Sequence, residues 1–161
     1  MMSMFLNEAT KLRAQTIIKE LEKRNMHGVF CATKEDALKQ ALSYIKEGSS
    51  VSWGGSMSVS EIGLMDALKE GNYQLIDRSV AKNFDEQREI FSKAVLSDYF
   101  LMSSNAITLD GELINIDGTG NRVACLSYGP KHVIMIVGMN KVVNDVEDGI
   151  KRVRNFASPP N

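Results

Sequence analysis

The segment of residues 98–122 constrains the fold more than any other part of the sequence. It joins an apolar run, a tight-turn signal and a glycine-rich loop. Residues 99–102 are apolar without a break and are followed by two serines, a pattern typical of a strand inside a sheet. Asp110-Gly111 then lies between two apolar-rich arms, and this dipeptide predicts a β-hairpin.

The expected turn of this hairpin has two residues and is of type I′, with positive φ at both positions. In that register Ile107 lies opposite Ile114, and their side chains share one face. The hairpin is expected to add antiparallel strands at one edge of a larger sheet, or to form a flap.

The loop of residues 117–122 after the hairpin has a composition suited to an anion. Gly118 and Gly120 let backbone N–H groups approach a ligand, and a helix that begins near Asn121 points its positive end toward it. Arg122 can hold a carboxylate or phosphate with two hydrogen bonds, and alanine should then replace it with little loss of stability. The same residues also fit a structural interpretation: a tight strand-to-helix turn, with Asn121 as the N-cap and Arg122 paired with a surface acid.

A second glycine-containing loop, residues 54–56, follows an expected strand at residues 50–53. A strand, glycines and a helix start together bind anions in α/β proteins, but the lysine of a P-loop and the spacing of a dinucleotide fingerprint are missing. This loop alone therefore does not predict an ATP or NAD site. Ser58 and Glu61 form either a capping box or, with Glu61 as an acid/base or nucleophile, part of an active site. Trp53 can stack on a ligand or serve as a core aromatic.

Strands alternate with helices from residue 27 onward, which predicts a mainly parallel sheet with helices on both faces. The expected fold is a single three-layer α/β domain with an added β-hairpin. A helix is expected to follow a cap at Thr33. We expect further strands at residues 27–32, 73–77 and 132–137, and helices at 3–25, 61–70, 84–96, 123–126 and 143–156. The expected divisions are an N-terminal helix over residues 1–25, a domain over 26–156 and a tail over 157–161.

Three polar or glycine-rich turns follow strand ends, and in a parallel sheet such turns meet at the carboxyl edge. We therefore expect one pocket there. Its candidate catalytic carboxylates are Glu61 and Asp117. Its candidate ligand-binding residues are Gly54, Gly55, Ser56, Ser58, Asn105, Gly118, Thr119, Gly120, Asn121, Arg122, Asn140 and Lys141.

Composition excludes several classes of protein. A 43% hydrophobic and 24% charged chain with net charge −1 is typical of a globular protein and argues against nucleic acid as a partner. Two cysteines and two histidines are too few for an iron–sulfur cluster or a usual zinc site within one chain. No stretch is long enough for a membrane span and no signal-peptide pattern is present, so we expect a cytoplasmic protein, compatible with a homo-oligomer.

The sequence of residues 105–122, together with residues 52–63, 129–134 and 137–143, resembles the LUD (lactate utilization) domain family. The resemblance implies a fold similar to the NagB/RpiA/CoA transferase-like group. It also implies a part in the bacterial oxidation of L-lactate to pyruvate, together with iron–sulfur redox subunits.

Three functional hypotheses remain from the sequence. The first is a lactate-utilization protein whose pocket binds a small anionic metabolite, a nucleotide or a CoA-like ligand. The second is a stand-alone enzyme of the CoA-transferase or isomerase kind that uses Glu61 or Asp117. The third is an assembly module without chemistry of its own.

Overall fold

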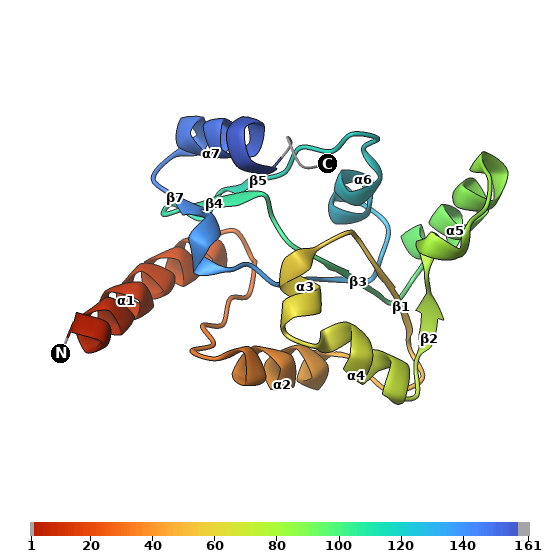
Figure 1. The fold of residues 1–161 in the computed structure, drawn as a ribbon, viewed down its shortest axis with the longest axis horizontal. Helices are drawn as coiled ribbons and strands as arrows, with labels where there is room; N and C mark the ends of the chain where they lie inside the picture. The colour runs from red at the N-terminus through yellow and green to blue at the C-terminus, as the bar shows by residue number, and fades with distance from the viewer. Residues whose placement is uncertain (1, 158–161) are drawn as a thin grey trace. The chain divides into compact units, whose positions relative to one another are not determined.

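The computed structural model describes residues 2–157, and of residues 2–6 only the backbone. Contacts within the chain divide it into two compact units (Figure 1), each of which is described by itself. The first unit comprises Met1–Cys31, Ser104–Ile116 and Val137–Asn161; the second comprises Ala32–Ser103 and Asp117–Ile136. The expected boundaries at residues 25 and 156 stay a prediction, and residues 158–161 of the expected tail lie outside the described residues.

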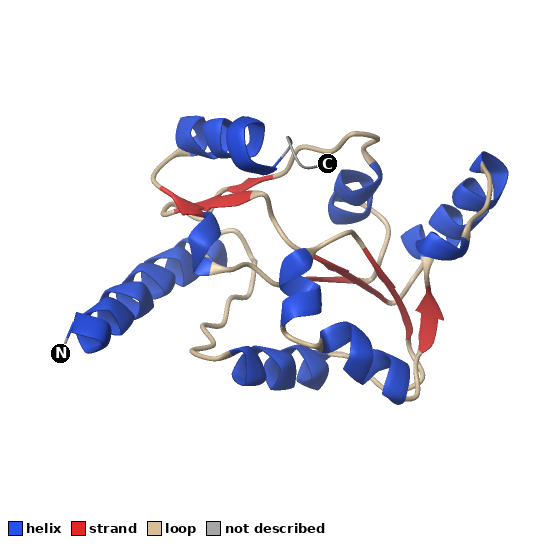
Figure 2. Cartoon of the chain, viewed as in Figure 1, coloured by secondary structure: helices blue, strands red, loops and turns tan. Residues whose placement is uncertain are grey.

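A four-stranded parallel sheet forms the centre of the second unit (Figure 2). Its strand order is β2-β1-β3-β6, and every neighbouring pair is parallel. The strands are β1 (Ser50–Trp53), β2 (Gln74–Ile76), β3 (Tyr99–Met102) and β6 (His132–Met135). The prediction of an α/β fold with a mainly parallel sheet is thus confirmed.

The two faces of this sheet carry different helices. Successive side chains of a strand point to opposite faces, so the fully buried β3 contributes to two cores. Tyr99 and Leu101 pack in a core with α2, α3 and α4, whereas Phe100 and Met102 pack with α5 and α6. The second unit therefore has three layers. These helices are α2 (Lys34–Tyr44), α3 (Met57–Glu61), α4 (Leu64–Glu70), α5 (Phe84–Val95) and α6 (Asn121–Ser127), with the short 3₁₀ helix η1 (Arg78–Val80) between β2 and α5.

Side-chain caps set the starts of three of these helices, α2, α3 and α5, the last through Asn83, whose side chain accepts from the Glu86 N–H at 2.9 Å. The Thr33 hydroxyl accepts a hydrogen bond from the Asp36 N–H at 3.0 Å, as predicted. The cap of α3 is Ser56, whose hydroxyl accepts from the Val59 N–H at 3.4 Å.

The Ser56 cap makes the predicted capping box of Ser58 and Glu61 wrong, because Ser58 lies inside the first turn of α3 and Glu61 ends that helix. The helix expected over residues 61–70 is also interrupted. Gly63 adopts a left-handed φ of 74°, which ends one helix and lets α4 start at Leu64.

The first unit contains the second sheet, in which the strand order is β5-β4-β7. The hairpin pair β4 and β5 is antiparallel, and β7 adds to β4 in parallel. The predicted hairpin thus exists, but it belongs to a separate small sheet and not to an edge of the large one. The elements of this unit are α1 (Met2–Glu22), β4 (Ala106–Thr108), β5 (Leu113–Ile114), η2 (Met139–Lys141), β7 (Val142–Val143), α7 (Val146–Arg152) and the π-helical turn η3 (Val153–Ala157).

The predicted register of the hairpin is wrong by one residue. Ile107 lies opposite Leu113, and Ala106 lies opposite Ile114. A shift of one residue exchanges the two faces of a strand, so Ile114 packs in a core with Ala106 and Val153.

The cause of the shift is a turn of three residues instead of two. The Gly111 N–H donates to the Thr108 carbonyl at 3.1 Å, and Gly111 alone in the turn has a positive φ, of 76°. This is the type I turn followed by a left-handed residue that is common in three-residue hairpins. The fully buried Thr108 reinforces it, because its hydroxyl accepts from the Glu112 N–H and donates to the Glu112 carboxylate, both at 3.0 Å.

Residues 27–32 form no strand, contrary to the prediction. Asn25 adopts a positive φ of 58° after α1, and the chain then folds back along this helix. A Cβ on Gly28 would lie 3.0 Å from Cγ1 of Ile18, so the segment packs on α1 instead of on a neighbouring strand.

The end of the chain also differs from the prediction of one helix over residues 143–156. Val142 and Val143 pair with β4 instead. The Asp145 carboxylate then accepts from the Asp148 N–H at 2.8 Å and starts α7. None of the described helices is both long enough and apolar enough to cross a bilayer.

Candidate functional site

The candidate site lies in the second unit, at the edge of the sheet where parallel strands end. β1 ends at Trp53 and its neighbour β2 ends at Ile76, so the turns after both strands leave at the same edge. In open α/β sheets this edge is the usual place for ligands.

The two glycine-containing loops of the second unit meet as predicted. A Cβ on Gly54 would lie only 3.3 Å from Cδ of Arg122 and 3.4 Å from its Cγ. Gly54 therefore lets the aliphatic part of Arg122 pack closely against the chain after β1. The loops of residues 54–56 and 117–122, far apart in sequence, are brought together at this point.

Arg122 is held by the protein itself. Its Nε and Nη2 both lie 2.8 Å from Oδ1 of Asp117, and its Nη1 donates to the Ser103 carbonyl at 2.8 Å. The side chains of Arg122 and Asp117 are only 13% and 7% exposed. The other Asp117 oxygen accepts from the Val123 N–H at 2.7 Å. These bonds fasten the loop before α6 to the end of β3.

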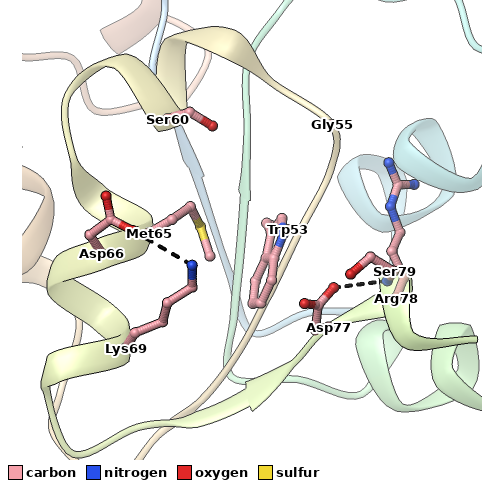
Figure 3. A pocket seen from close by; sticks show the side chains of 9 residues that line it. All are labelled: Trp53, Gly55, Ser60, Met65, Asp66, Lys69, Asp77, Arg78 and Ser79. Carbon is pink, nitrogen blue, oxygen red and sulfur yellow. Dashed lines mark hydrogen bonds and ion pairs between the residues drawn. The ribbon is translucent and has the colours of Figure 1, made fainter.

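An open cleft of about 440 Å³ lies beside Trp53 at the same edge (Figure 3). Trp53 stands between α4 on one side and the turn after β2 on the other. The lining residues are Trp53, Gly55, Ser60, Met65, Asp66, Lys69, Asp77, Arg78 and Ser79.

Arg78 brings a guanidinium to the lining of this cleft, and it is not among the ligand-binding residues predicted from the sequence. A Cβ on Gly55 would lie 3.2 Å from Nη2 of Arg78, so the glycine gives the guanidinium room to approach. Among the residues that the structure describes, the Arg78 side chain has no hydrogen-bond or ion-pair partner. It lies directly after β2, at the same edge as Gly54 and Gly55, but no local sequence pattern marks it as a site residue.

The acidic groups of the cleft already have partners. The Asp77 carboxylate accepts from the Ser79 N–H at 2.8 Å, and Asp66 lies 3.6 Å from Nζ of Lys69. The second pair is largely exposed, so it holds Lys69 only weakly. Arg78 and Lys69 thus lie on opposite sides of Trp53, and the Arg78 guanidinium is the charged group of this lining for which the described residues supply no partner.

Cys125 lies behind the cleft in the core under α6 and is almost fully buried. Burial raises the pKa of the Cys125 thiol; the nearby Arg78 guanidinium opposes this rise and the Asp117 carboxylate adds to it. A thiol with a raised pKa and no exposure is a poor nucleophile.

The remaining predicted residues of the second unit take mixed positions. Glu61 is exposed and lies 3.5 Å from Nζ of Lys34, outside the lining of the cleft. Gly118, Thr119 and Gly120 are exposed. Asn121 is not the N-cap of α6; Gly120 takes that position with a left-handed φ of 76°, and Asn121 instead accepts from the Arg122 N–H at 2.9 Å.

Three predicted ligand-binding residues, Asn105, Asn140 and Lys141, belong to the first unit. The Asn105 side chain accepts from the Ile116 N–H at 3.1 Å. The Arg152 guanidinium donates to the carbonyls of both Asn105 and Asn140. These bonds join the start of β4 to the η2 turn within that unit. Within residues 2–157, no cluster of three or more histidine, cysteine or acidic side chains is arranged to hold a metal ion.

Comparison with known proteins gives one match. Residues 14–161 match the family model of the LUD domain. No curated protein and no solved structure matches the chain significantly. Since the family match covers nearly the whole sequence, the chain belongs to the LUD domain family, which is associated with lactate utilization.

Proposed function

We propose that this LUD domain protein takes part in the oxidation of L-lactate to pyruvate and binds a small anionic ligand in the cleft beside Trp53. The observation that carries the proposal is the Arg78 guanidinium, which lines the cleft without a partner among the described residues. A guanidinium binds a carboxylate or phosphate through two parallel hydrogen bonds, and Gly55 leaves room for the Arg78 guanidinium beside the chain after β1.

The redox step is assigned to separate iron–sulfur partner subunits. The chain has two cysteines in total, and they lie in different units: Cys31 in the first and Cys125 in the second. A cluster held by four thiolates needs more ligands than these. In this proposal the chain binds the anion, and the partners accept the electrons that leave L-lactate.

Arg122 has a supporting role in the proposed site. Its bonds to Asp117 and to the Ser103 carbonyl fix the loop of residues 117–123, and its aliphatic part packs on Gly54. Gly54 directly precedes Gly55, so this contact stabilises the backbone against which the Arg78 guanidinium lies.

Calorimetric titration of the purified chain with L-lactate and with inorganic phosphate tests the anion site. Arg78→Ala should weaken binding roughly tenfold to a hundredfold, because it removes charge-assisted hydrogen bonds worth about 1.5–3 kcal/mol. Arg88→Ala is the matched control. This residue lies on α5 over the Phe84 ring, outside the cleft lining, and its loss should leave affinity unchanged. Equal affinity of Arg78→Ala and wild type would reject the site.

Deletion of the gene tests the metabolic role. Growth on L-lactate as the sole carbon source should fail while growth on glucose continues, and the wild-type gene should restore it. Mass spectrometry of proteins captured with the tagged chain should then find iron–sulfur subunits. Normal growth on L-lactate after deletion would contradict the proposal.

The stand-alone enzyme is the weaker alternative. A general base must lie within reach of a substrate proton, yet Glu61 pairs with Lys34 and Asp117 is bound by Arg122. Activity of the purified chain that is lost in Glu61→Gln, and not in Ser60→Ala beside it, would favour this alternative over the proposal.

A further inference from the structure

Trp53, the single tryptophan of the chain, stands at the centre of the cleft. It is the last residue of β1 and is half-buried, with part of its ring packed against the core on the α2–α4 face of the sheet. Figure 3 shows the ring between the side chains of Met65 and Lys69 and those of the turn after β2. Among the described residues no acceptor is found for the indole N–H.

The cleft is large for a short hydroxy acid. Its volume of about 440 Å³ falls within the range of roughly 300–1,000 Å³ that is typical of sites for larger organic ligands. L-Lactate alone would fill a small part of this space and would leave the face of Trp53 uncovered. The space beside Trp53 can therefore take an anion that carries a further planar or apolar part.

We infer that the cleft takes a mononucleotide, with its planar base against Trp53 and its phosphate on Arg78. This inference rests on the proposed function, because Arg78 is the same anion ligand in both. Aromatic side chains hold bases by stacking, whichever base is present. Arginine matches the geometry of a phosphate, and the missing side chain at Gly55 gives the Arg78 guanidinium its place beside the chain after β1.

The remaining polar groups of the cleft fit the sugar between base and phosphate. The carboxylate of Asp77, on the same side of Trp53 as Arg78, supplies an acceptor for a hydroxyl group, as an acidic residue does for the ribose in dinucleotide sites. Lys69 adds positive charge on the α4 side. A ring, a sugar and a phosphate thus each find suitable partners around Trp53.

Fluorescence of the single tryptophan reports on this site directly. The purified chain is titrated with AMP, adenosine, ribose 5-phosphate and L-lactate. AMP should quench the emission and bind roughly tenfold or more tightly than ribose 5-phosphate, because only AMP adds a stacked base. Calorimetry should show that Trp53→Leu weakens the binding of AMP much more than that of ribose 5-phosphate, whereas Trp53→Phe keeps most of the preference for AMP.

The four probes separate this inference from the proposed function. If ribose 5-phosphate or L-lactate binds in an Arg78-dependent manner but AMP binds no more tightly, the mononucleotide is rejected and the anion site stands. If AMP binds equally well to wild type and to Trp53→Leu, the stacking position is rejected. If none of the probes binds, both proposals fall.

Discussion

Arg122→Ala should lower the free energy of unfolding by about 3–5 kcal/mol, the usual effect of removing one partner from a buried ion pair. The physical reason is the carboxylate that remains. Asp117 is 7% exposed and would keep only the Val123 N–H as a partner, while the Ser103 carbonyl would lose its donor. For a chain of this length the melting temperature should fall by roughly 6–20 °C.

A second ion pair in the same unit provides the control. Nζ of Lys93 lies 2.8 Å from the Glu89 carboxylate, the same separation as in the Arg122 pair, but these side chains are 59% and 68% exposed. Exposed pairs one helical turn apart contribute about 0.3–0.5 kcal/mol. Lys93→Ala should therefore leave the free energy of unfolding almost unchanged. Because both ion pairs have the same N–O distance, the comparison shows the effect of burial alone.

Urea unfolding of wild type, Arg122→Ala, Asp117→Ala and the double variant measures the effect. The double variant should lose much less than the sum of the single losses, because it leaves no unpaired buried charge. If Arg122→Ala melts like wild type while anion binding disappears, the structural account is wrong and Arg122 is the ligand clamp that its sequence context suggested.

Two further predictions concern stability. Gly111→Ala should destabilise the protein more than Gly48→Ala. Both positions have a positive φ, 76° and 80°, and this backbone conformation penalises a side chain by about 1–2 kcal/mol. A Cβ on Gly111 would in addition lie 3.0–3.2 Å from atoms of α1, whereas one on Gly48 would meet nothing within 4 Å. Thermal melts check this, and equal losses would contradict it. The hydrogen bond from Lys131, followed by those from the Ser50 N–H and hydroxyl, holds the pKa of the Asp98 carboxyl far below its usual range. The stabilisation by ionised Asp98 should be complete above the pKa of the unfolded state, near 4, and should be lost as the pH falls below that value. The difference in urea midpoint between wild type and Asp98→Asn should therefore shrink from about pH 5 to pH 2. A constant difference would reject this linkage.

The local sequence was sufficient for the elements that depend on near neighbours. The apolar run of residues 99–102 predicted a strand with all four side chains buried, and the structure has it. Thr33 predicted a helix start through a bond to an N–H three residues away. Alternation of strands and helices predicted the parallel sheet, and the Asp110-Gly111 dipeptide predicted the hairpin. Each depends on periodicity or on bonds within one turn of chain.

The candidate site was predicted in part. The sequence led to the edge of the sheet at which the structure has a cleft, and to the meeting of residues 54–56 with 117–122, because parallel strands end together. It did not select Arg78, since a single arginine after a short strand has no distinctive local pattern. Its place in the cleft becomes evident only when β2 lies beside β1.

Tertiary packing determined the features of the structure that the local sequence left open. A two-residue turn and a three-residue turn at Asp110-Gly111 give hairpin registers that differ by one residue. In the three-residue turn that the protein adopts, Thr108 is buried and Ile114 packs against Val153. Residues 27–32 suit a strand, but contact with α1 takes the place of a neighbouring strand. The local sequence of Arg122 suits a ligand or an acid, and only the structure shows that the Asp117 carboxylate lies 2.8 Å from its guanidinium. In each case the local sequence allows both alternatives, and contacts between segments distant along the chain select one of them.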